Sequence, residues 1–263
     1  MSPELREVVE KAYVVFSKFK RGPSIYSLYG PKLDADVEAA LLTSPLRDIS
    51  QEQLAQHHDR ACSYAPHDHW WPYYLPRYFE LIADYEFPTR LGADFALQCL
   101  AHSDYREDLP RKQIAVIHHF GVAFFRQFVC EPVSCLDADR LQVCYCHSHY
   151  QNVYNVLNMF VGARIPLTEL LSCWDRITGR DPDLHLASFV NFLYQSARYG
   201  AKSGFSLLVK DTGTILADWL ATTHVRRRLE MAFFDTSDEH EQWMLSLAEE
   251  RLSQAEAVCS KMR

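Results

Sequence analysis

The sequence predicts an all-α protein of about ten helices, and three observations support that prediction. Only 9 of the 263 residues are glycine, which is about half of the usual share of roughly 7%. Apolar residues recur at steps of three and four along most of the chain, the spacing of one helix face. Hydrophobic residues make up 48% of the chain and charged residues 23%, a composition typical of a folded protein with a sizeable core.

Six helices are expected in the first half of the chain. Ser50, with Gln53 three residues later, predicts a capping box at the start of the third helix. Pro76 and Pro110 are each expected in the first turn of a helix, where the N–H that proline lacks is not needed. The apolar stripe of the first helix is Leu5, Val9, Ala12, Phe16 and Phe19. The six expected ranges are about 5–19, 34–43, 50–62, 76–82, 91–101 and 114–129.

Five helices are expected in the second half. Asp137 is an expected helix cap, and Asp181-Pro182 supplies a cap followed by proline for a helix that Gly200 ends. The expected ranges are about 141–161, 167–177, 182–199, 215–234 and 238–261. Residues 205–214 combine a short apolar run with the turn Asp211-Thr212-Gly213, a pattern that also fits a short hairpin.

These helices are expected to form one domain over residues 1–263, because no linker rich in proline, glycine or serine divides them. Consecutive helices joined by short loops favour antiparallel pairs. The sequence leaves open whether the pairs form an irregular bundle or a curved array of the kind built by HEAT repeats.

Charge and cysteine content favour a cytoplasmic protein, and no cofactor is expected because the cofactor-binding motifs are absent. The chain has 27 Lys and Arg against 34 Asp and Glu, a net charge of −7, which disfavours binding to nucleic acid. No apolar run approaches the roughly 18 residues of a membrane span, and the first nineteen residues lack the apolar core of a secretory signal. The eight cysteines are therefore expected to be reduced thiols.

An acidic segment near the end of the chain is the first candidate for a binding surface. Residues 229–250 contain seven carboxylates and no lysine or arginine. The candidate contacts for a basic partner are Asp235, Asp238, Glu239 and Glu241. Trp70 and Trp71, in an aromatic run, are the candidate anchors, because tryptophan is enriched at binding hot spots. The alternatives are a solvated helix start for the acids and core packing for the aromatic run.

A second hypothesis is a metal-dependent hydrolase of the helical HD type. His57-His58-Asp59 and His67-Asp68 are its candidate ligands, since an adjacent His and Asp can bind a metal that activates water. The short spacing between the two groups favours the alternative of a polar loop with a capping aspartate. His118-His119, in an apolar helix, point about 100° apart and are not expected to share an ion.

Two further clusters are noted. Residues 144–149, Cys-Tyr-Cys-His-Ser-His, hold four potential ligands, but a helix there would project them in different directions. Arg226-Arg227-Arg228 is a compact basic cluster in a helix, too short to indicate nucleic-acid binding. The phosphate-loop, dinucleotide-binding, nucleophile-elbow and zinc-protease motifs are all absent from the sequence.

Residues 44–49, Ser-Pro-Leu-Arg-Asp-Ile, followed by residues 74–81, Tyr-Leu-Pro-Arg-Tyr-Phe-Glu-Leu, resemble a family of uncharacterised bacterial proteins. In that family a Pro-Leu-Arg turn precedes an aromatic-Leu-Pro-Arg helix, and a Cys-x-x-Cys often comes before the turn. Here the matching stretch, about 25–35, has no cysteine. The overall character is also similar to that of immunity proteins of bacterial toxin systems, which are often acidic, cytosolic and without catalytic motifs.

The sequence therefore favours a non-enzymatic protein that binds another protein. The second resemblance implies an immunity protein that occludes the active site of a basic toxin domain. No nucleic-acid or membrane partner is expected, and the oligomeric state is left open. The alternatives are the metal-dependent hydrolase and a helical scaffold or adaptor.

Overall fold

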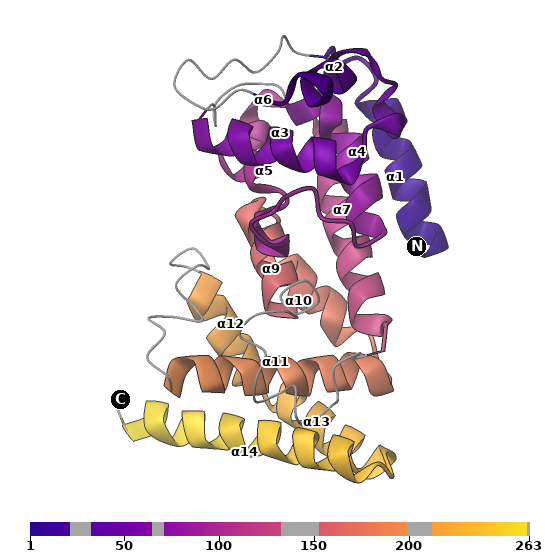
Figure 1. Ribbon diagram of the computed structural model, residues 1–263. Helices are drawn as coiled ribbons and strands as arrows, with labels where there is room; N and C mark the ends of the chain where they lie inside the picture. The colour runs from indigo at the N-terminus through magenta and orange to yellow at the C-terminus, as the bar shows by residue number, and fades with distance from the viewer. Residues whose placement is uncertain (22–32, 65–70, 133–152, 199–211, 262–263) are drawn as a thin grey trace. The chain divides into compact units, whose positions relative to one another are not determined.

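The computed structural model describes residues 1–21, 33–64, 71–132, 153–198 and 212–261 (Figure 1). Every regular element in these ranges is an α-helix or a short 3-10 helix, and no strand occurs among them. The all-α prediction is therefore confirmed. None of the described helices is long and apolar enough to cross a lipid bilayer.

The chain divides into two compact units, which are described separately. The N-terminal unit comprises mainly Met1–Gln127 and Asn155–Ile165, and the C-terminal unit comprises mainly Pro166–Arg263 together with a shorter segment that begins at Phe128. The expectation of one domain over residues 1–263 stays a prediction.

The N-terminal unit is built from short and medium helices. In chain order they are α1 (Pro3–Val15), α2 (Ala35–Thr43), η1 (Leu46–Asp48), α3 (Gln51–Tyr64), α4 (Trp71–Ala83), η2 (Ala93–Phe95), α5 (Gln98–Ala101), α6 (Tyr105–Asp108), most of α7 (Arg111–Cys130) and most of α9 (Val153–Gly162). The capping box predicted for α3 is present. Ser50 Oγ accepts from Gln53 N at 3.2 Å, and Gln53 Oε1 accepts from Ser50 N at 2.9 Å.

Aromatic rings form the core of this unit. Phe79 of α4 stacks on Phe120 of α7 with ring centroids 3.9 Å apart. Phe124, one turn further along α7, meets Phe160 of α9 edge to face at 5.7 Å. Gly121 lies between these two phenylalanines on α7 and allows α9 to approach closely, because a Cβ there would come within 3.2 Å of Phe160 Cδ1. The core thus joins α4, α7 and α9.

The C-terminal unit contains α10 (Leu167–Asp175), α11 (Arg180–Arg198), α12 (Thr212–Leu220), α13 (Thr223–Asp235) and α14 (Glu239–Lys261). Helices α13 and α14 form an antiparallel pair, since contacts join Thr236 to Glu241 near the turn and Arg226 to Glu249 further out. Helix α11 runs alongside α14 in the same direction (Figure 1). The bonded pairs Arg180–Glu241, Asn191–Arg251 and Tyr194–Gln254 follow one another along both helices.

The first helix ends at Val15 and not near residue 19, and three further expected helix boundaries are wrong. Pro76 lies inside α4 and not in its first turn, because the buried aromatic side chains before it extend the helix back to Trp71. The helix expected over 91–101 is only η2 and α5, and Gly92 before η2 has a φ of 126°, which no helix accommodates.

The third concerns the helix expected over 215–234, which divides into α12 and α13 at Ala221-Thr222. Thr222 caps α13 by accepting from Val225 N at 3.4 Å. Most of the hairpin expected over 205–214 lies outside the described residues, and its last three residues, Thr212-Gly213-Thr214, begin α12.

Candidate functional site

A cleft of about 660 Å³ opens in the C-terminal unit. Its walls come from the α10–α11 junction, from one face of α13, and from the α13–α14 turn. The acidic and basic residues that line it are Asp175, Arg180, Asp183, His224, Arg227, Arg228, Asp235, Asp238 and Glu241. We call this hollow the charged cleft.

A buried carboxylate fixes one end of the charged cleft. Glu241, in the first turn of α14, is only 1% exposed. Both of its oxygens accept from the Arg180 guanidinium, the Nε contact measuring 3.1 Å, and Thr236 Oγ1 donates to Oε2 at 2.7 Å. A buried charge needs such partners to offset its lost hydration. This pair therefore ties the start of α11 to the start of α14.

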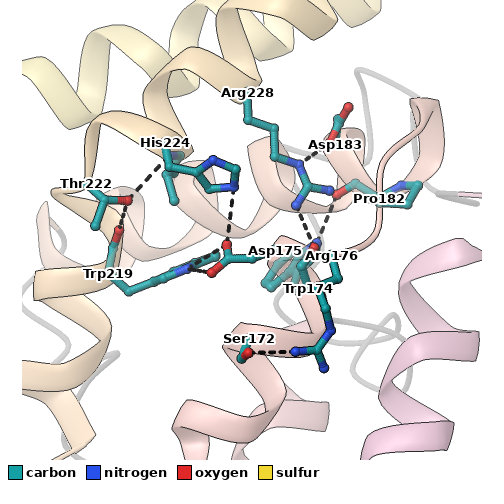
Figure 2. A network of polar contacts seen from close by, with 11 residues as sticks. Ser172, Trp174, Asp175, Arg176, Pro182, Asp183, Trp219, Thr222, His224 and Arg228 are labelled. Atoms are coloured by element: carbon teal, nitrogen blue, oxygen red, sulfur yellow. Dashed lines mark hydrogen bonds and ion pairs between the residues drawn. The ribbon is translucent and has the colours of Figure 1, made fainter.

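A second ion pair lies in the wall between α11 and α13 (Figure 2). The Arg228 guanidinium donates through Nε to Asp183 and through Nη1 to the Trp174 carbonyl at 2.7 Å. Burial raises the pKa of the Asp183 carboxyl, and the charge of Arg228 opposes that rise. Trp174 Nε1 donates in turn to the Pro182 carbonyl at 3.2 Å. The indole, the arginine and the first turn of α11 are thus held together.

Asp175, at the end of α10, anchors α12 and faces α13 (Figure 2). Trp219 Nε1 donates to its two oxygens at 3.0 and 3.2 Å. His224 Nε2 lies 3.6 Å from Asp175 Oδ1, which is an ion-pair distance and longer than a hydrogen bond. This carboxylate does not orient His224 as it would orient a general base, which requires a hydrogen bond.

Two oppositely charged side chains in the charged cleft lack an ion-pair partner among the described residues. Arg227 and Asp235 are both exposed on α13, and neither side chain makes a hydrogen bond or ion pair within the part of the chain that the structure describes. Asp238 differs, because its carboxylate caps α14 by accepting from His240 N and Glu241 N at 2.9 and 3.0 Å.

The helix segments on both sides of the α13–α14 turn carry large exposed apolar side chains. Phe234 is 74% exposed, Met231 is 55% exposed and Trp243 is 54% exposed. Seven large apolar side chains are exposed in the described ranges, and these three lie within thirteen residues of one another. We define the aromatic corner as Met231, Phe234, Asp235, Asp238, Glu239 and Trp243. Exposed apolar residues gathered in this way mark interaction sites more often than scattered ones do.

The four carboxylates predicted to bind a partner differ in their exposure. Asp235, Asp238 and Glu239 are exposed, as the prediction requires. Glu241 is not available, because it is buried in its pair with Arg180.

Neither of the two predicted tryptophan anchors is described as an exposed residue in this structure. Trp71 is 3% exposed and meets the Tyr105 ring edge to face at 6.5 Å in the N-terminal unit, so it is a core residue and not a surface anchor. Trp70 lies outside the described residues.

The candidate metal ligands point to separate partners. His58 is buried between the Tyr78 hydroxyl at 3.0 Å and the Phe95 carbonyl at 2.9 Å. Asp59 accepts from Thr89 Oγ1 at 2.7 Å and from Arg90 N at 3.1 Å.

The other ligand candidates do not complete a site. His57 rests against the Tyr74 ring, and His67 and Asp68 lie outside the described residues, as does the cluster at 144–149. In the ranges described, no three His, Cys, Asp or Glu residues lie where they could hold one metal ion. His118 and His119 are directed to different partners, Tyr105 and Glu4, as their helical spacing predicts.

The two motifs that carry the family resemblance meet in the N-terminal unit. Arg47 of the Pro-Leu-Arg turn and Arg77 of the Leu-Pro-Arg helix both bind Glu80, at 3.0 and 2.6 Å. Arg77 Nε also donates to the Ile49 carbonyl at 2.8 Å, and Arg47 lies over the Tyr13 ring at 3.8 Å. In this structure the motif fastens η1 and α1 to α4.

Sequence reasoning missed the charged cleft and the aromatic corner. The acidic segment contains residues of both, but Arg180, which pairs with Glu241, lies far outside the segment. The other ion pair of the cleft, Arg228 with Asp183, involves no acid of that segment. One signal was present for Glu241: it precedes Met244, Leu245 and Ala248 by three, four and seven residues, which places it on the buried face of α14.

Comparisons with protein-family models, with curated proteins and with solved structures found no match to this chain.

Proposed function

We propose that this is a binding protein that engages a partner protein through the aromatic corner. The observation that carries the proposal is the exposure of Phe234 and Trp243, 74% and 54%, beside three exposed carboxylates. Covering the exposed parts of two such rings removes roughly 250 Å² of apolar surface from water, worth about 6 kcal/mol before the costs of association. That gain is typical of the aromatic anchors that dominate interfaces.

The charge around the rings supports a basic partner. Asp235, Asp238 and Glu239 surround the turn between α13 and α14, and all three are exposed. Carboxylates at the rim of an interface accelerate encounter with a positive surface and select against acidic ones. Glu241, being buried and paired, is not part of this contact surface.

The most concrete form of this proposal is an immunity protein in the cytoplasm that covers the basic active site of a toxin domain. The acidic aromatic corner supports that reading. A helical scaffold or adaptor would use the same surface and differs only in the identity of its partner. The metal-hydrolase alternative gains no support, since His57, His58 and Asp59 are directed to separate partners.

The test is affinity capture from the native host with matched variants. The double variant Phe234→Ser and Trp243→Ser removes both rings from the aromatic corner. Leu91→Ser is the control, because Leu91 is 57% exposed and lies in the N-terminal unit. Far-UV circular dichroism of each variant checks that the helices are retained.

We expect the wild type and the control to retain one basic protein that the double variant loses. Purified partner and wild-type chain should then bind in a calorimeter, more weakly as salt increases. Capture of the partner by the double variant at the wild-type level would overturn the proposal.

A further inference from the structure

Arg227, Met231 and Asp235 form a stripe along one wall of the charged cleft. They are spaced four residues apart on α13, so they share one face of that helix, and all three line the cleft. At a rise of 1.5 Å per residue, Arg227 and Asp235 are about 12 Å apart along the axis. The stripe thus presents a cation, an apolar side chain and an anion in that order.

The two charges at the ends of the stripe are not neutralised by other described residues of the chain. The carboxylates of Asp183 and Glu241 are neutralised by arginines, as described above. Arg227 and Asp235 make no ion pair within the described ranges and lie too far apart to pair with each other. A ligand that neutralises both must carry a negative group at one end and a positive group at the other.

An extended peptide has the geometry to do this. Alternate residues of a strand point to the same side, and residues four apart are separated by about 13 Å, close to the separation of Arg227 and Asp235. The hydroxyls of Thr178 and Ser237, which also line the cleft, have no hydrogen-bond partner among the described residues. They are able to bond to main-chain groups of such a segment.

From these observations we propose that the charged cleft binds an extended peptide segment with an acidic, an apolar and a basic side chain at alternate positions. The acidic side chain faces Arg227, the apolar one covers Met231 and the basic one faces Asp235. This inference rests on the proposed function, in that the segment belongs to the protein partner, and it adds the charge pattern that the cleft recognises. The basic end lies beside the aromatic corner, which shares Met231, Asp235 and Asp238 with the cleft.

The test uses synthetic peptides and needs no knowledge of the partner. The mixed probes are Glu-Ser-Leu-Ser-Lys and its reverse, Lys-Ser-Leu-Ser-Glu, both with blocked ends. The comparison peptides are Lys-Ser-Leu-Ser-Lys and Glu-Ser-Leu-Ser-Glu. Binding to the full chain is followed by the NMR signal of the Met231 methyl group, identified by its absence from a Met231→Leu variant.

Charge-reversal variants supply the decisive comparison. In the wild type we expect one of the two mixed peptides to bind tightest. In Arg227→Glu the dibasic peptide should become the tightest, and in Asp235→Lys the diacidic peptide should. Reversing one exposed charge turns an attraction into a repulsion, so each change in preference should be about tenfold at low salt.

Matched controls reverse charges outside the cleft. Arg111→Glu and Asp218→Lys change exposed residues that do not line it, and both should keep the wild-type order of preference. The same order in all five proteins, or no movement of the Met231 signal with any peptide, would overturn the inference. Loss of partner capture in the Phe234→Ser and Trp243→Ser variant is a separate result, so failure of the peptide inference and failure of the proposed function can be told apart.

Discussion

Mild acid should destabilise the N-terminal unit through the two buried imidazoles of α3. Burial lowers the pKa of His57 to about 3 and that of His58 to about 4, against 6.5 for an exposed imidazole. His58 is neutral with its proton on Nε2, because that nitrogen must donate to the Phe95 carbonyl while Nδ1 accepts from the Tyr78 hydroxyl. The native state thus holds both rings uncharged.

The sign of the pH dependence follows from proton binding. Below about pH 6.5 the unfolded chain binds a proton at each imidazole and the folded chain does not, so the free energy of unfolding falls as the pH falls. Between about pH 7 and about pH 5 each ring accounts for a loss of about 2 kcal/mol, and the two together for about 4 kcal/mol. The loss levels off only near the folded-state pKa values.

Urea unfolding followed by far-UV circular dichroism measures this loss. His58→Gln removes one of the two titrating rings, while the amide still offers a donor to Phe95 and an acceptor to Tyr78. Its loss between about pH 7 and about pH 5 should be about 2 kcal/mol smaller than that of the wild type. The control His119→Gln removes an exposed imidazole and should keep the wild-type loss. Equal losses in the wild type and in His58→Gln would refute the reasoning.

Three further substitutions test the packing and the charged cleft. Gly121→Ala would overlap Ile165 Cδ1 and should lower the free energy of unfolding by about 1–3 kcal/mol. Gly162→Ala is the matched control: its added Cβ meets open space, so it should be neutral or stabilising by up to about 1 kcal/mol. Both effects are measured from the midpoints of urea unfolding. Glu241→Gln keeps the side-chain shape but loses the ion pair with Arg180. Since Arg180 is half exposed, we expect the free energy of unfolding to fall by about 1–2 kcal/mol. An unchanged free energy of unfolding would contradict the pairing. Arg228→Met leaves the carboxylate of Asp183 buried without its partner and should cost about 3 kcal/mol, with Arg227→Met as the unpaired control that costs little.

The sequence was most informative where a signal is local. The capping box at Ser50 and the long apolar pattern of α7 are read from adjacent residues, and both are present. The break between α12 and α13 was missed, because the apolar pattern continues through it and only the Thr222 side chain marks the new start. Pro76 was misplaced because tertiary burial of α4 overrides the usual penalty for proline inside a helix.

In the candidate site, too, the sequence predicts the local features and misses those that depend on distant residues. That residues 229–250 are acidic is visible in the sequence, but the neutralisation of Glu241 depends on Arg180, which lies 61 residues away along the chain. By residue type alone, Trp71 and Trp243 are equally good candidates for a binding surface. Only the structure shows that the first is buried and the second exposed. Long-range pairing and exposure are properties of the fold, so local patterns predict them poorly.

Site-specific photo-crosslinking at the aromatic corner tests the proposed function most directly. The photoreactive residue p-benzoylphenylalanine replaces Phe234 or Trp243 in two variants, and Leu91 in a third that serves as control. Irradiation in the native host should yield one discrete adduct with a basic protein from the first two variants and none from the third. No adduct at either corner position, or the same adduct from Leu91, would contradict the account.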